Sequence, residues 1–258
     1  MKVVILCGGR GTRLGRESEV RPKPMVSIGD RPILWHIMKY YASFGHKDFI
    51  LCLGHLGDVI KDHFLHYEAR QNDITIELGN KSKVKIHSSH DEQDWQVTLA
   101  NTGLDTNTGA RVKWIEQYLD EDLFFLTYGD GLSNIDLNEL LAMQRRHGKL
   151  ATVSAVHPPA RFGELNLKDG RIGHFSEKPQ TSAGLINGGF FVFRREALKY
   201  LSRDERCSLE HDFLVKLTEA GEVMAYEHHG FWQCMDTVRE LAILNELWES
   251  GRAPWKTW

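Results

Sequence analysis

The chain has 258 residues, which suits one large α/β domain or a domain with a small insertion. Its 32 basic and 35 acidic side chains give a formal net charge of -3, so its overall charge offers no attraction to nucleic acid or to an anionic membrane. No apolar run approaches the roughly 20 residues of a membrane span, and the N-terminal apolar run is too short for a signal peptide. We therefore expect a cytoplasmic protein that binds neither nucleic acid nor a membrane.

The four cysteines do not form a metal or redox motif. Cys7, Cys52, Cys207 and Cys234 lie far apart, and no CxxC pair is present, which argues against structural zinc and thioredoxin-like chemistry. We expect these side chains to be reduced thiols, most of them buried. The sequence places no carboxylate or third ligand beside any pair of the 13 histidines, so it predicts no histidine metal site.

The first 25 residues carry the strongest functional signal. The apolar run at residues 3–7 predicts a buried strand, and the Gly-Gly-Arg-Gly sequence that follows it lets backbone N–H groups approach a ligand closely. Arg10, Arg13 and Lys23 add positive charge, and Lys23 stands between two prolines that restrict its backbone. Cations beside exposed amides suit a polyphosphate better than a lone carboxylate.

Two common phosphate loops are excluded at this position. The dinucleotide fingerprint GxGxxG, started at Gly9, meets Leu14 where its third glycine should be. The P-loop needs a glycine followed by lysine and then serine or threonine, and no glycine here has that continuation. The N-terminal loop therefore belongs to another class of phosphate site.

The next elements predict a parallel α/β sheet. A helix begins at Pro32 and ends before Gly45, a strand covers residues 48–53, and a second helix covers residues 58–70. This βαβα order is typical of a parallel sheet with right-handed crossovers. From residue 74 to about 110 short β-like pieces alternate with polar turns, which indicates an insertion that is a lid, a subunit contact or a plain surface loop.

The second half of the chain adds a carboxylate at a strand end. Residues 123–127 form an apolar strand, and Asp130 follows it between two glycines. A carboxylate at the carboxyl end of a parallel strand points into the ligand crevice and suits magnesium, although an aspartate that only stabilises a turn is the alternative.

The remaining segments alternate between helices and strands. They are predicted as a helix at 134–147, a strand at 151–156, an antiparallel hairpin at 162–167 and 171–175, a helix from 208 to about 220, and a strand at 223–226. Thr237 and Glu240 form a capping box for a last helix, so the carboxylate of Asp236, just before it, is available for another partner.

The N-terminal motifs resemble those of the sugar-1-phosphate nucleotidyltransferases. Gly8 to Leu14 match GGxGTRL, and residues 22–25 match a PKPM element. Further segments, which together span essentially the whole chain, resemble one branch of this superfamily, the glucose-1-phosphate cytidylyltransferases. These segments are 32–38, 128–131, 163–165, 177–179, 187–190 and 253–258.

The resemblance implies a mixed, mostly parallel Rossmann-like sheet with flanking helices, of the nucleotide-diphospho-sugar transferase type, plus a small antiparallel β section, in a single domain over residues 1–258. It implies transfer of CMP from CTP to glucose-1-phosphate with Mg²⁺ as cofactor, giving CDP-glucose and pyrophosphate. UTP or dTTP in place of CTP is an alternative. It also implies a homo-oligomer, for which a hexamer is one candidate.

The resemblance further implies residue roles. Arg13 and Lys23 would be catalytic, stabilising the departing pyrophosphate and the α-phosphate, and Asp130 and Asp236 would hold the metal. The implied nucleotide-binding residues are Leu6, Cys7, Gly8, Gly9, Arg10, Gly11, Thr12, Arg13, Lys23, Thr106, Arg111 and Gly129. The implied sugar-phosphate residues are Gly163, Glu177, Lys178, Asn187 and Gly188. The chain departs from the family pattern at Ala110, usually glycine, and at Cys234, usually proline.

A different class of function is a catalytically silent sugar-nucleotide sensor or regulatory subunit. The presence of Arg13, Lys23, Asp130 and Asp236 favours an enzyme. A module that binds NAD is disfavoured because Leu14 replaces the third glycine.

Overall fold

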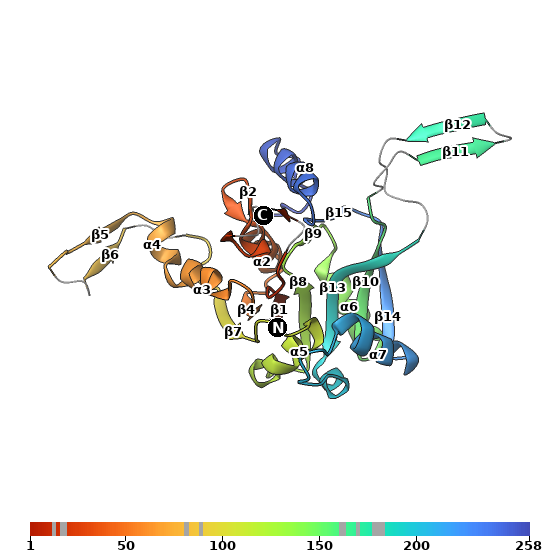
Figure 1. Ribbon diagram of the computed structural model, residues 1–258, viewed down its shortest axis with the longest axis horizontal. Coiled ribbons are helices and arrows are strands. Elements are labelled where there is room, and N and C mark those ends of the chain that lie inside the picture. Colours follow the sequence, from red (N-terminus) through yellow and green to blue (C-terminus); the bar gives the residue numbers. More distant parts are fainter. Residues whose placement is uncertain are drawn as a thin grey trace.

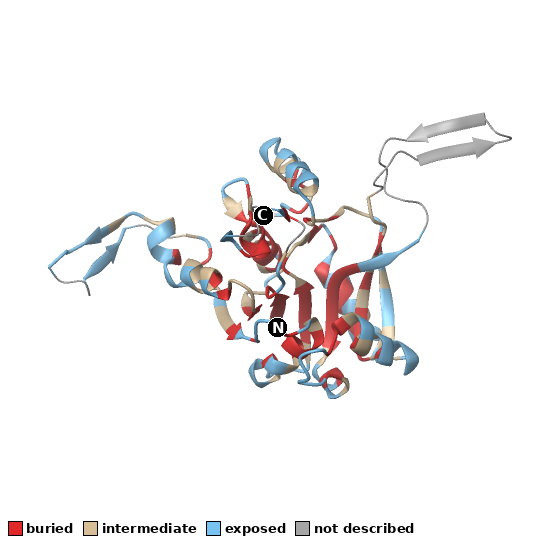
Figure 2. Ribbon diagram, in the orientation of Figure 1, coloured by how far each residue is buried: buried red, intermediate tan, exposed pale blue. Residues whose placement is uncertain are grey.

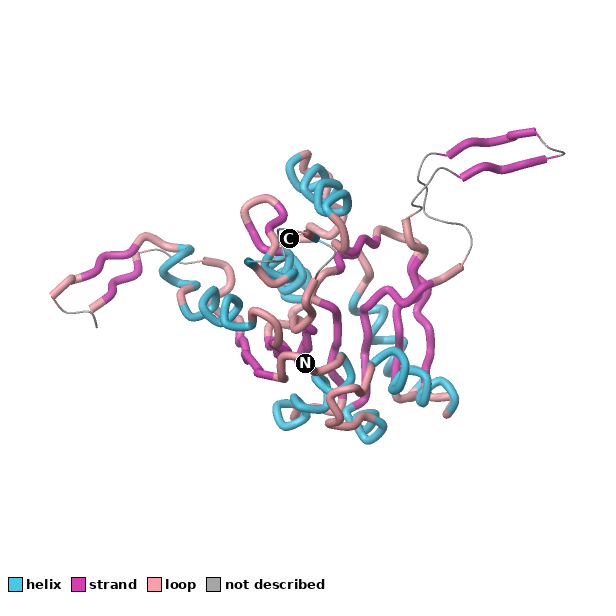
Figure 3. The backbone as a smooth tube through the Cα atoms, viewed as in Figure 1, coloured by secondary structure: helices cyan, strands magenta, loops and turns pink. Residues whose placement is uncertain are grey.

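A seven-stranded sheet runs through the middle of the molecule in the order β14-β10-β13-β8-β1-β4-β7. The computed structural model describes residues 1–11, 14–15, 20–79, 83–87, 90–159, 164–168, 171–176 and 184–258, with the backbone alone at 164–168 and 171–176. The strands of the sheet are β1 (Lys2–Leu6), β4 (Asp48–Leu53), β7 (Gln96–Asn101), β8 (Leu123–Tyr128), β10 (Ala151–Val156), β13 (Ile186–Arg194) and β14 (Val223–His228). They lie side by side in Figures 1 and 3.

The pairing confirms the predicted mixed, mostly parallel sheet. Strand β1 pairs in parallel with both β4 and β8, and β4 with β7. Only β13 runs against its neighbours β10 and β8 within this sheet. Parallel neighbours bring their carboxyl ends to one edge, which is where such sheets bind ligands.

Apolar residues on both faces of the strands bury the sheet between two helical layers. Along β1, Val3 and Ile5 face a core formed with α2 (Ile33–Ser43), α3 (Gly57–Leu65), α6 (Leu137–His147) and α8 (Val238–Glu249). Val4 and Leu6 face the other core, formed with α5 (Thr108–Trp114), η3 (Ile115–Tyr118), η4 (Arg195–Tyr200), η5 (Leu209–Leu214) and α7 (Val215–Glu219). Figure 2 shows the inner strands of the sheet largely in the colour of buried residues, whereas the edge strands β7 and β14 are mostly partly or fully exposed. Each fully buried aliphatic side chain contributes about 1.5–3 kcal/mol.

Several predicted boundaries are wrong, for local reasons. Helix α6 begins at Leu137 and not at 134, because the Asp136 carboxylate accepts from two N–H groups of the first turn and acts as the cap. The helix predicted at 58–70 is divided at His66 into α3 and α4 (Tyr67–Gln71). The helix predicted from Ser208 consists of the π-helix η5 followed by α7. The capping box of Thr237 and Glu240 is confirmed.

Short segments complete the structure. The helical turn η2 (Lys23–Met25) precedes the pair β2 (Ser27–Ile28) and β3 (Arg31–Pro32). Strands β9 (Gly131–Ser133) and β15 (Trp232–Cys234) pair with each other, and β11 (Glu164–Lys168) and β12 (Arg171–Ser176) form the predicted antiparallel hairpin. In the described part of the chain, no helix is both long enough and apolar enough to cross a lipid bilayer.

The hairpin of β5 (Ile74–Ile76) and β6 (Val84–Ile86) stands away from the sheet, at the left of Figure 1. It falls within the segment predicted as an insertion, whereas β7 of the same segment is an edge strand of the central sheet. The hairpin exposes apolar side chains, with Leu78 at 87% and Ile76 at 47%.

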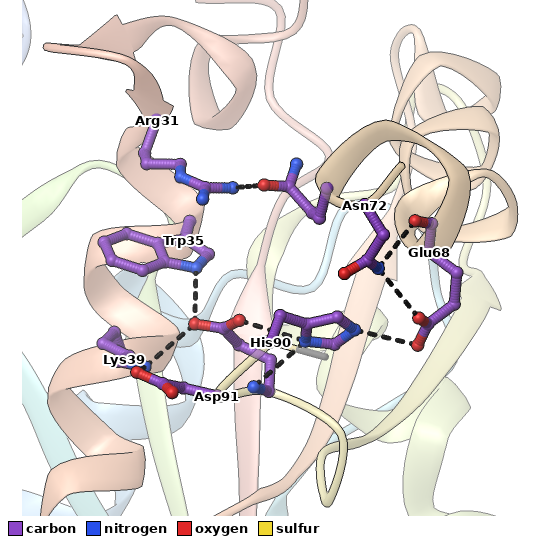
Figure 4. A network of polar contacts seen from close by, with 9 residues as sticks. Arg31, Trp35, Lys39, Glu68, Asn72, His90 and Asp91 are labelled. Atoms are coloured by element: carbon purple, nitrogen blue, oxygen red, sulfur yellow. Dashed lines mark hydrogen bonds and ion pairs between the residues drawn. The ribbon is translucent and has the colours of Figure 1, made fainter. Parts of the chain in front are cut away.

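A buried carboxylate, Glu92, fixes the chain that returns from the hairpin. It accepts hydrogen bonds from Trp35 Nε1 (3.2 Å) and Lys39 Nζ (2.9 Å) of α2. Its neighbour His90 donates from Nε2 to Glu68 Oε1 of α4 (2.9 Å), as Figure 4 shows. These contacts attach the base of the hairpin to two helices, so the position of the hairpin is set by the body of the protein.

The C-terminal segment packs on the domain around His36. The His36 ring is fully buried on α2, donates from Nε2 to the carbonyl of Ile28 (3.0 Å) and accepts at Nδ1 from Trp255 Nε1 (3.4 Å). Trp248 lies edge-on to this ring, at 4.5 Å between centroids. Burial lowers the pKa of His36 from 6.5 to about 4. The neutral ring is thus a fixed link between α2 and the C-terminal tryptophans.

We expect this histidine to make the free energy of unfolding pH-dependent. The folded pKa is lowered, so between pH 6.5 and 4 the unfolded chain binds a proton that the folded chain excludes, and stability falls as the pH falls through that window. Urea unfolding at pH 7.5 and pH 5 measures the loss. It should be about 2 kcal/mol larger in the wild type than in His36→Gln, and equal losses in both proteins would contradict the assignment.

Candidate functional site

The site lies where β1 and β8 end side by side. These strands pair in parallel with Leu6 opposite Tyr128, and the N–H of Gly129 donates to the carbonyl of Leu6 (3.1 Å). The glycine-rich loop after β1 and the Gly129–Asp130 turn after β8 therefore start at the same edge of the sheet. The fold itself brings the two predicted motifs together.

A cavity of about 390 Å³ opens at this edge. It contains every predicted nucleotide-binding residue that the structure describes, together with both predicted metal ligands. The lining residues are Leu6, Cys7, Gly8, Gly9, Arg10, Gly11, Lys23, Pro24, Thr106, Asn107, Thr108, Arg111, Tyr128, Gly129, Asp130 and Asp236. Thr12 and Arg13 lie outside the described residues.

Arg111 holds the glycine-rich loop from behind. It is 4% exposed and projects from α5. Its guanidinium donates to the hydroxyl of Thr102 (2.8 Å). It also donates to the backbone carbonyls of Gly8 (3.2 Å), Leu53 (3.0 Å), Gly103 (2.7 Å) and Leu104 (3.2 Å). Its donors thus fix the chain around the cavity.

The approach of Arg111 explains the glycine at position 8. A β-carbon on Gly8 would lie 2.3 Å from the Arg111 guanidinium carbon, so only glycine fits there. Gly11 has a φ of +62°, a conformation that other residues adopt only with strain. Ala110, which replaces the usual family glycine, lies inside α5, where helical backbone angles suit alanine well.

Lys23 joins the two predicted metal ligands. Its ammonium lies 2.5 Å from Asp130 Oδ2 and 2.5 Å from Asp236 Oδ1. Burial by itself lowers the pKa of Lys23, but the carboxylate of Asp130 and then that of Asp236 outweigh this effect and raise it. The lysine therefore remains a fixed positive charge in the cavity.

The backbone around these carboxylates is firmly held. The N–H of Met235 donates to the carbonyl of Asp130 (2.8 Å), which ties the loop before α8 to the turn after β8. The N–H of Asp236 donates to Glu240 Oε2 (2.6 Å), so the glutamate of the capping box also orients Asp236. The same helix start that was predicted to leave the Asp236 carboxylate available thus aims it at Lys23.

The donor set fits a divalent magnesium ion. Two carboxylates that converge on one cation, at the edge of a cavity large enough for phosphates, match the preference of magnesium for a few carboxylate oxygens shared with substrate phosphates. In the described residues no cluster of three or more His, Cys, Asp or Glu side chains is present. Among the described residues, Asp130 and Asp236 are therefore the candidate magnesium ligands.

A second cavity of about 220 Å³ adjoins the first. Asn187 and Gly188 line it, as do Trp232 and Cys234, and it shares Tyr128, Asp130 and Asp236 with the larger cavity. The aspartates thus stand at the border of two cavities. The other predicted sugar-phosphate residues, Gly163, Glu177 and Lys178, lie outside the described residues.

Cys234, at the position where the family usually has proline, stands in strand β15 at the edge of the second cavity. Burial raises the pKa of its thiol to about 12. The side chain is therefore a neutral thiol, and its strand pairing with Gly131 holds the loop before Asp236.

Several residues of the cavity walls lie outside the predicted site residues. Asn107 and Thr108 follow the predicted Thr106, and Tyr128 precedes the predicted Gly129, so the neighbouring motif was the signal that could have found them. Trp232 reaches the second cavity from a short strand that the sequence did not predict, and donates from Nε1 to the carbonyl of Gly188 (2.6 Å).

Comparison with known proteins assigns the family. A model of the family described as nucleotidyl transferase matches residues 2–247. The chain is 46% identical to glucose-1-phosphate cytidylyltransferase of Salmonella typhimurium, with all of both chains covered. The chain belongs to the glucose-1-phosphate cytidylyltransferase branch of the nucleotidyl transferase family.

Further relatives agree with this assignment. A probable glucose-1-phosphate cytidylyltransferase of Bacillus subtilis is 41% identical over the full length of both chains. The crystal structure of HddC from Yersinia pseudotuberculosis is similar at a TM-score of 0.68 and 23% identity, covering 96% of this chain and 99% of that one. The crystal structure of a UDP-glucose pyrophosphorylase in complex with UDP-glucose is similar at a TM-score of 0.67 and 16% identity, covering 97% of this chain and 99% of that one. At such identities the structures show a shared fold.

Proposed function

We propose that this nucleotidyltransferase transfers the cytidylyl group of CTP to glucose-1-phosphate and releases CDP-glucose and pyrophosphate. The observation that carries the proposal is the meeting of two cavities at Asp130 and Asp236, with the ammonium of Lys23 between the carboxylates. One cavity is lined by the glycine-rich loop and suits a triphosphate, and the other suits a smaller partner. The full-length identity of 46% to a glucose-1-phosphate cytidylyltransferase supports CTP and glucose-1-phosphate as the pair.

The larger cavity is the proposed nucleotide half. Backbone N–H groups of Gly8, Gly9 and Gly11 face the triphosphate there, next to the side chain of Arg10. Leu6, Cys7, Thr106 and Gly129 complete the wall. Arg111 contributes by holding the carbonyls behind the loop. Thr12 is proposed to bind the nucleotide, and Arg13 to stabilise the departing pyrophosphate.

The smaller cavity is the proposed sugar half. Asn187 offers an amide to the sugar hydroxyls, and its Oδ1 already accepts from the N–H of Gly189 (2.9 Å), which orients the side chain. Gly188 packs closely on β10, because a β-carbon there would lie 2.6 Å from Val156 Cγ1, and it forms part of the wall of this cavity. Gly163, Glu177 and Lys178 are proposed to bind the sugar and its phosphate.

The reaction requires that the substrates are correctly positioned and that their phosphate charge is neutralised, and it requires no covalent enzyme nucleophile. A phosphate oxygen of the sugar attacks the α-phosphorus in line as pyrophosphate leaves. Lys23, held as a cation by its two carboxylate neighbours, neutralises charge on the α-phosphate, and the loop amides hold the other phosphates. Bound at Asp130 and Asp236, Mg²⁺ would neutralise further phosphate charge.

A panel of nucleoside triphosphates tests the proposal. Purified protein receives glucose-1-phosphate, Mg²⁺ and CTP, UTP, dTTP, ATP or GTP in turn, and pyrophosphate release is followed. We expect CTP to be the best substrate. Preference for UTP or dTTP would contradict the cytidylyl assignment and keep the reaction class, and no release with any triphosphate would favour a regulatory protein instead.

Replacement of Lys23 by alanine should lower kcat by at least about 100-fold, because it removes the cation that faces the α-phosphate. The far-UV circular dichroism spectrum should stay near that of the wild type, since Lys23 lies outside both hydrophobic cores. The melting temperature should fall, because Asp130 and Asp236 lose their shared cation. Lys216→Ala, at an exposed position on α7, is the matched control and should keep the wild-type rate. A near-normal kcat for Lys23→Ala would remove this residue from the mechanism.

We also propose a homo-oligomer that uses the exposed β5–β6 hairpin. Ile76, Leu78, Val84 and Ile86 expose apolar surface on an element that stands away from the body, which is typical of a protein contact. Light scattering should give a mass above the 29.6 kDa of the chain. Leu78→Lys combined with Ile76→Lys should lower that mass, and a monomeric wild type would contradict the proposal.

A cytoplasmic location is proposed as well. The described cysteines are free thiols, three of them buried, as expected in a reducing compartment. CTP and a sugar phosphate as substrates would agree with that setting.

A further inference from the structure

A half-buried acidic side chain, Glu210, connects the walls of the two cavities although it lines neither of them. It lies in the first turn of η5, behind the site. Its Oε1 accepts from the hydroxyl of Tyr128 (2.6 Å), and its Oε2 accepts from the hydroxyls of Thr108 (2.8 Å) and Ser208 (2.9 Å). One carboxylate thus satisfies three hydroxyl donors.

Three hydroxyl groups and a backbone N–H stabilise this charge, and no cation pairs with Glu210 within the described part of the chain. Burial by itself raises the pKa of Glu210, but the hydrogen bonds from Tyr128, Thr108 and Ser208 outweigh burial and lower it. The side chain therefore remains an ionised acceptor. A carboxylate only accepts, so each hydroxyl must point its proton toward Glu210.

The first donor belongs to the nucleotide half. Thr108 lines the larger cavity and opens α5, the helix that also carries Arg111. Because its proton goes to Glu210, its oxygen accepts from the N–H of Leu209 (2.9 Å). The N–H of Ala110 donates to the carbonyl of Cys207 (3.0 Å), so the start of α5 is joined to the segment that carries Glu210.

The second donor belongs to the border with the sugar half. Tyr128 lines both cavities, and its hydroxyl oxygen is free to accept because its proton goes to Glu210. That oxygen accepts from Asn187 Nδ2 (3.4 Å), while Asn187 Oδ1 accepts from Gly189. The orientation of the Asn187 amide is thus set through Tyr128 by Glu210.

We propose that Glu210 is a positioning residue that couples the nucleotide half of the site to the sugar half. Through Thr108 it orients the N-terminal turn of α5 against the triphosphate, and through Tyr128 it orients Asn187 toward the sugar. This inference rests on the proposed function, because that function assigns CTP to the larger cavity and glucose-1-phosphate to the smaller one.

Replacement of Glu210 by glutamine tests the role, since it keeps the volume and replaces one acceptor oxygen with a donor. It should raise the KM for CTP and the KM for glucose-1-phosphate, each by about tenfold, with kcat changed less than about threefold. Glu219→Gln, an exposed glutamate at the end of α7, is the control and should keep both KM values. A residue that only stabilises the fold would lower the melting temperature and leave both KM values unchanged.

Double-mutant cycles test the coupling itself. Glu210→Gln combined with Tyr128→Phe should raise the KM for glucose-1-phosphate no further than the larger single change, and Glu210→Gln combined with Thr108→Val should behave likewise for CTP. Should Glu210→Gln fail to fold, the cycle of Thr108→Val with Tyr128→Phe replaces it, and its two effects should not multiply. KM values within about twofold of the wild type for either substrate, or effects that multiply independently, would overturn the proposal.

The outcome is separable from that of the proposed function. The wild type is first assayed with the triphosphate panel, and the variants are compared on whichever pair the wild type uses best. A wild type that prefers UTP contradicts the cytidylyl assignment and leaves the coupling test intact. A wild type active with CTP whose Glu210→Gln variant keeps both KM values contradicts only the coupling.

Discussion

The site depends on one ammonium group placed between two carboxylates. Lys23 Nζ lies within hydrogen-bond distance of Asp130 and Asp236, which come from segments 107 and 213 residues further along the chain. Removing the ammonium would leave two carboxylates without their shared cation in a partly buried place, which is costly. The same arrangement brings together the proposed phosphate-facing cation and the two proposed metal ligands, so one set of charges joins distant segments of the fold and would serve the proposed chemistry.

Rigid supports surround this charged centre. Arg111 donates to the carbonyls behind the glycine-rich loop, Glu240 orients Asp236, and Glu210 orients Tyr128 and Thr108. Each of these three side chains is charged and makes its hydrogen bonds to other groups of the protein. Such preorganisation lowers the cost of arranging polar groups when substrates arrive. It also explains why the site is formed by loops that nonetheless have defined positions.

Much of the architecture was predictable because strand and helix signals are local. The bounds of β4 and β10 follow from apolar runs, and the structure confirms them. Helix α2 begins at Ile33, one residue after the predicted Pro32, which is its N-cap. The start of α6 and the division at His66 were missed because capping by Asp136 and the path of the chain after α3 depend on details that periodicity does not contain. Strand β15 was missed because three residues are too few for a pattern.

The sequence alone determined the chemical class of the loops: glycines after an apolar strand, a lysine between prolines, and aspartates beside a strand end and a helix start. The sequence determines these features because each residue type suits a local backbone conformation that depends on only a few neighbouring residues. Only the tertiary structure decided that Lys23 faces Asp130 and Asp236, that Arg111 turns its donors toward Gly8, and that Glu210 reaches both Tyr128 and Thr108. Those contacts join residues far apart in the chain, and the pairing of β1 with β8 and the packing of helices on the sheet bring them within reach.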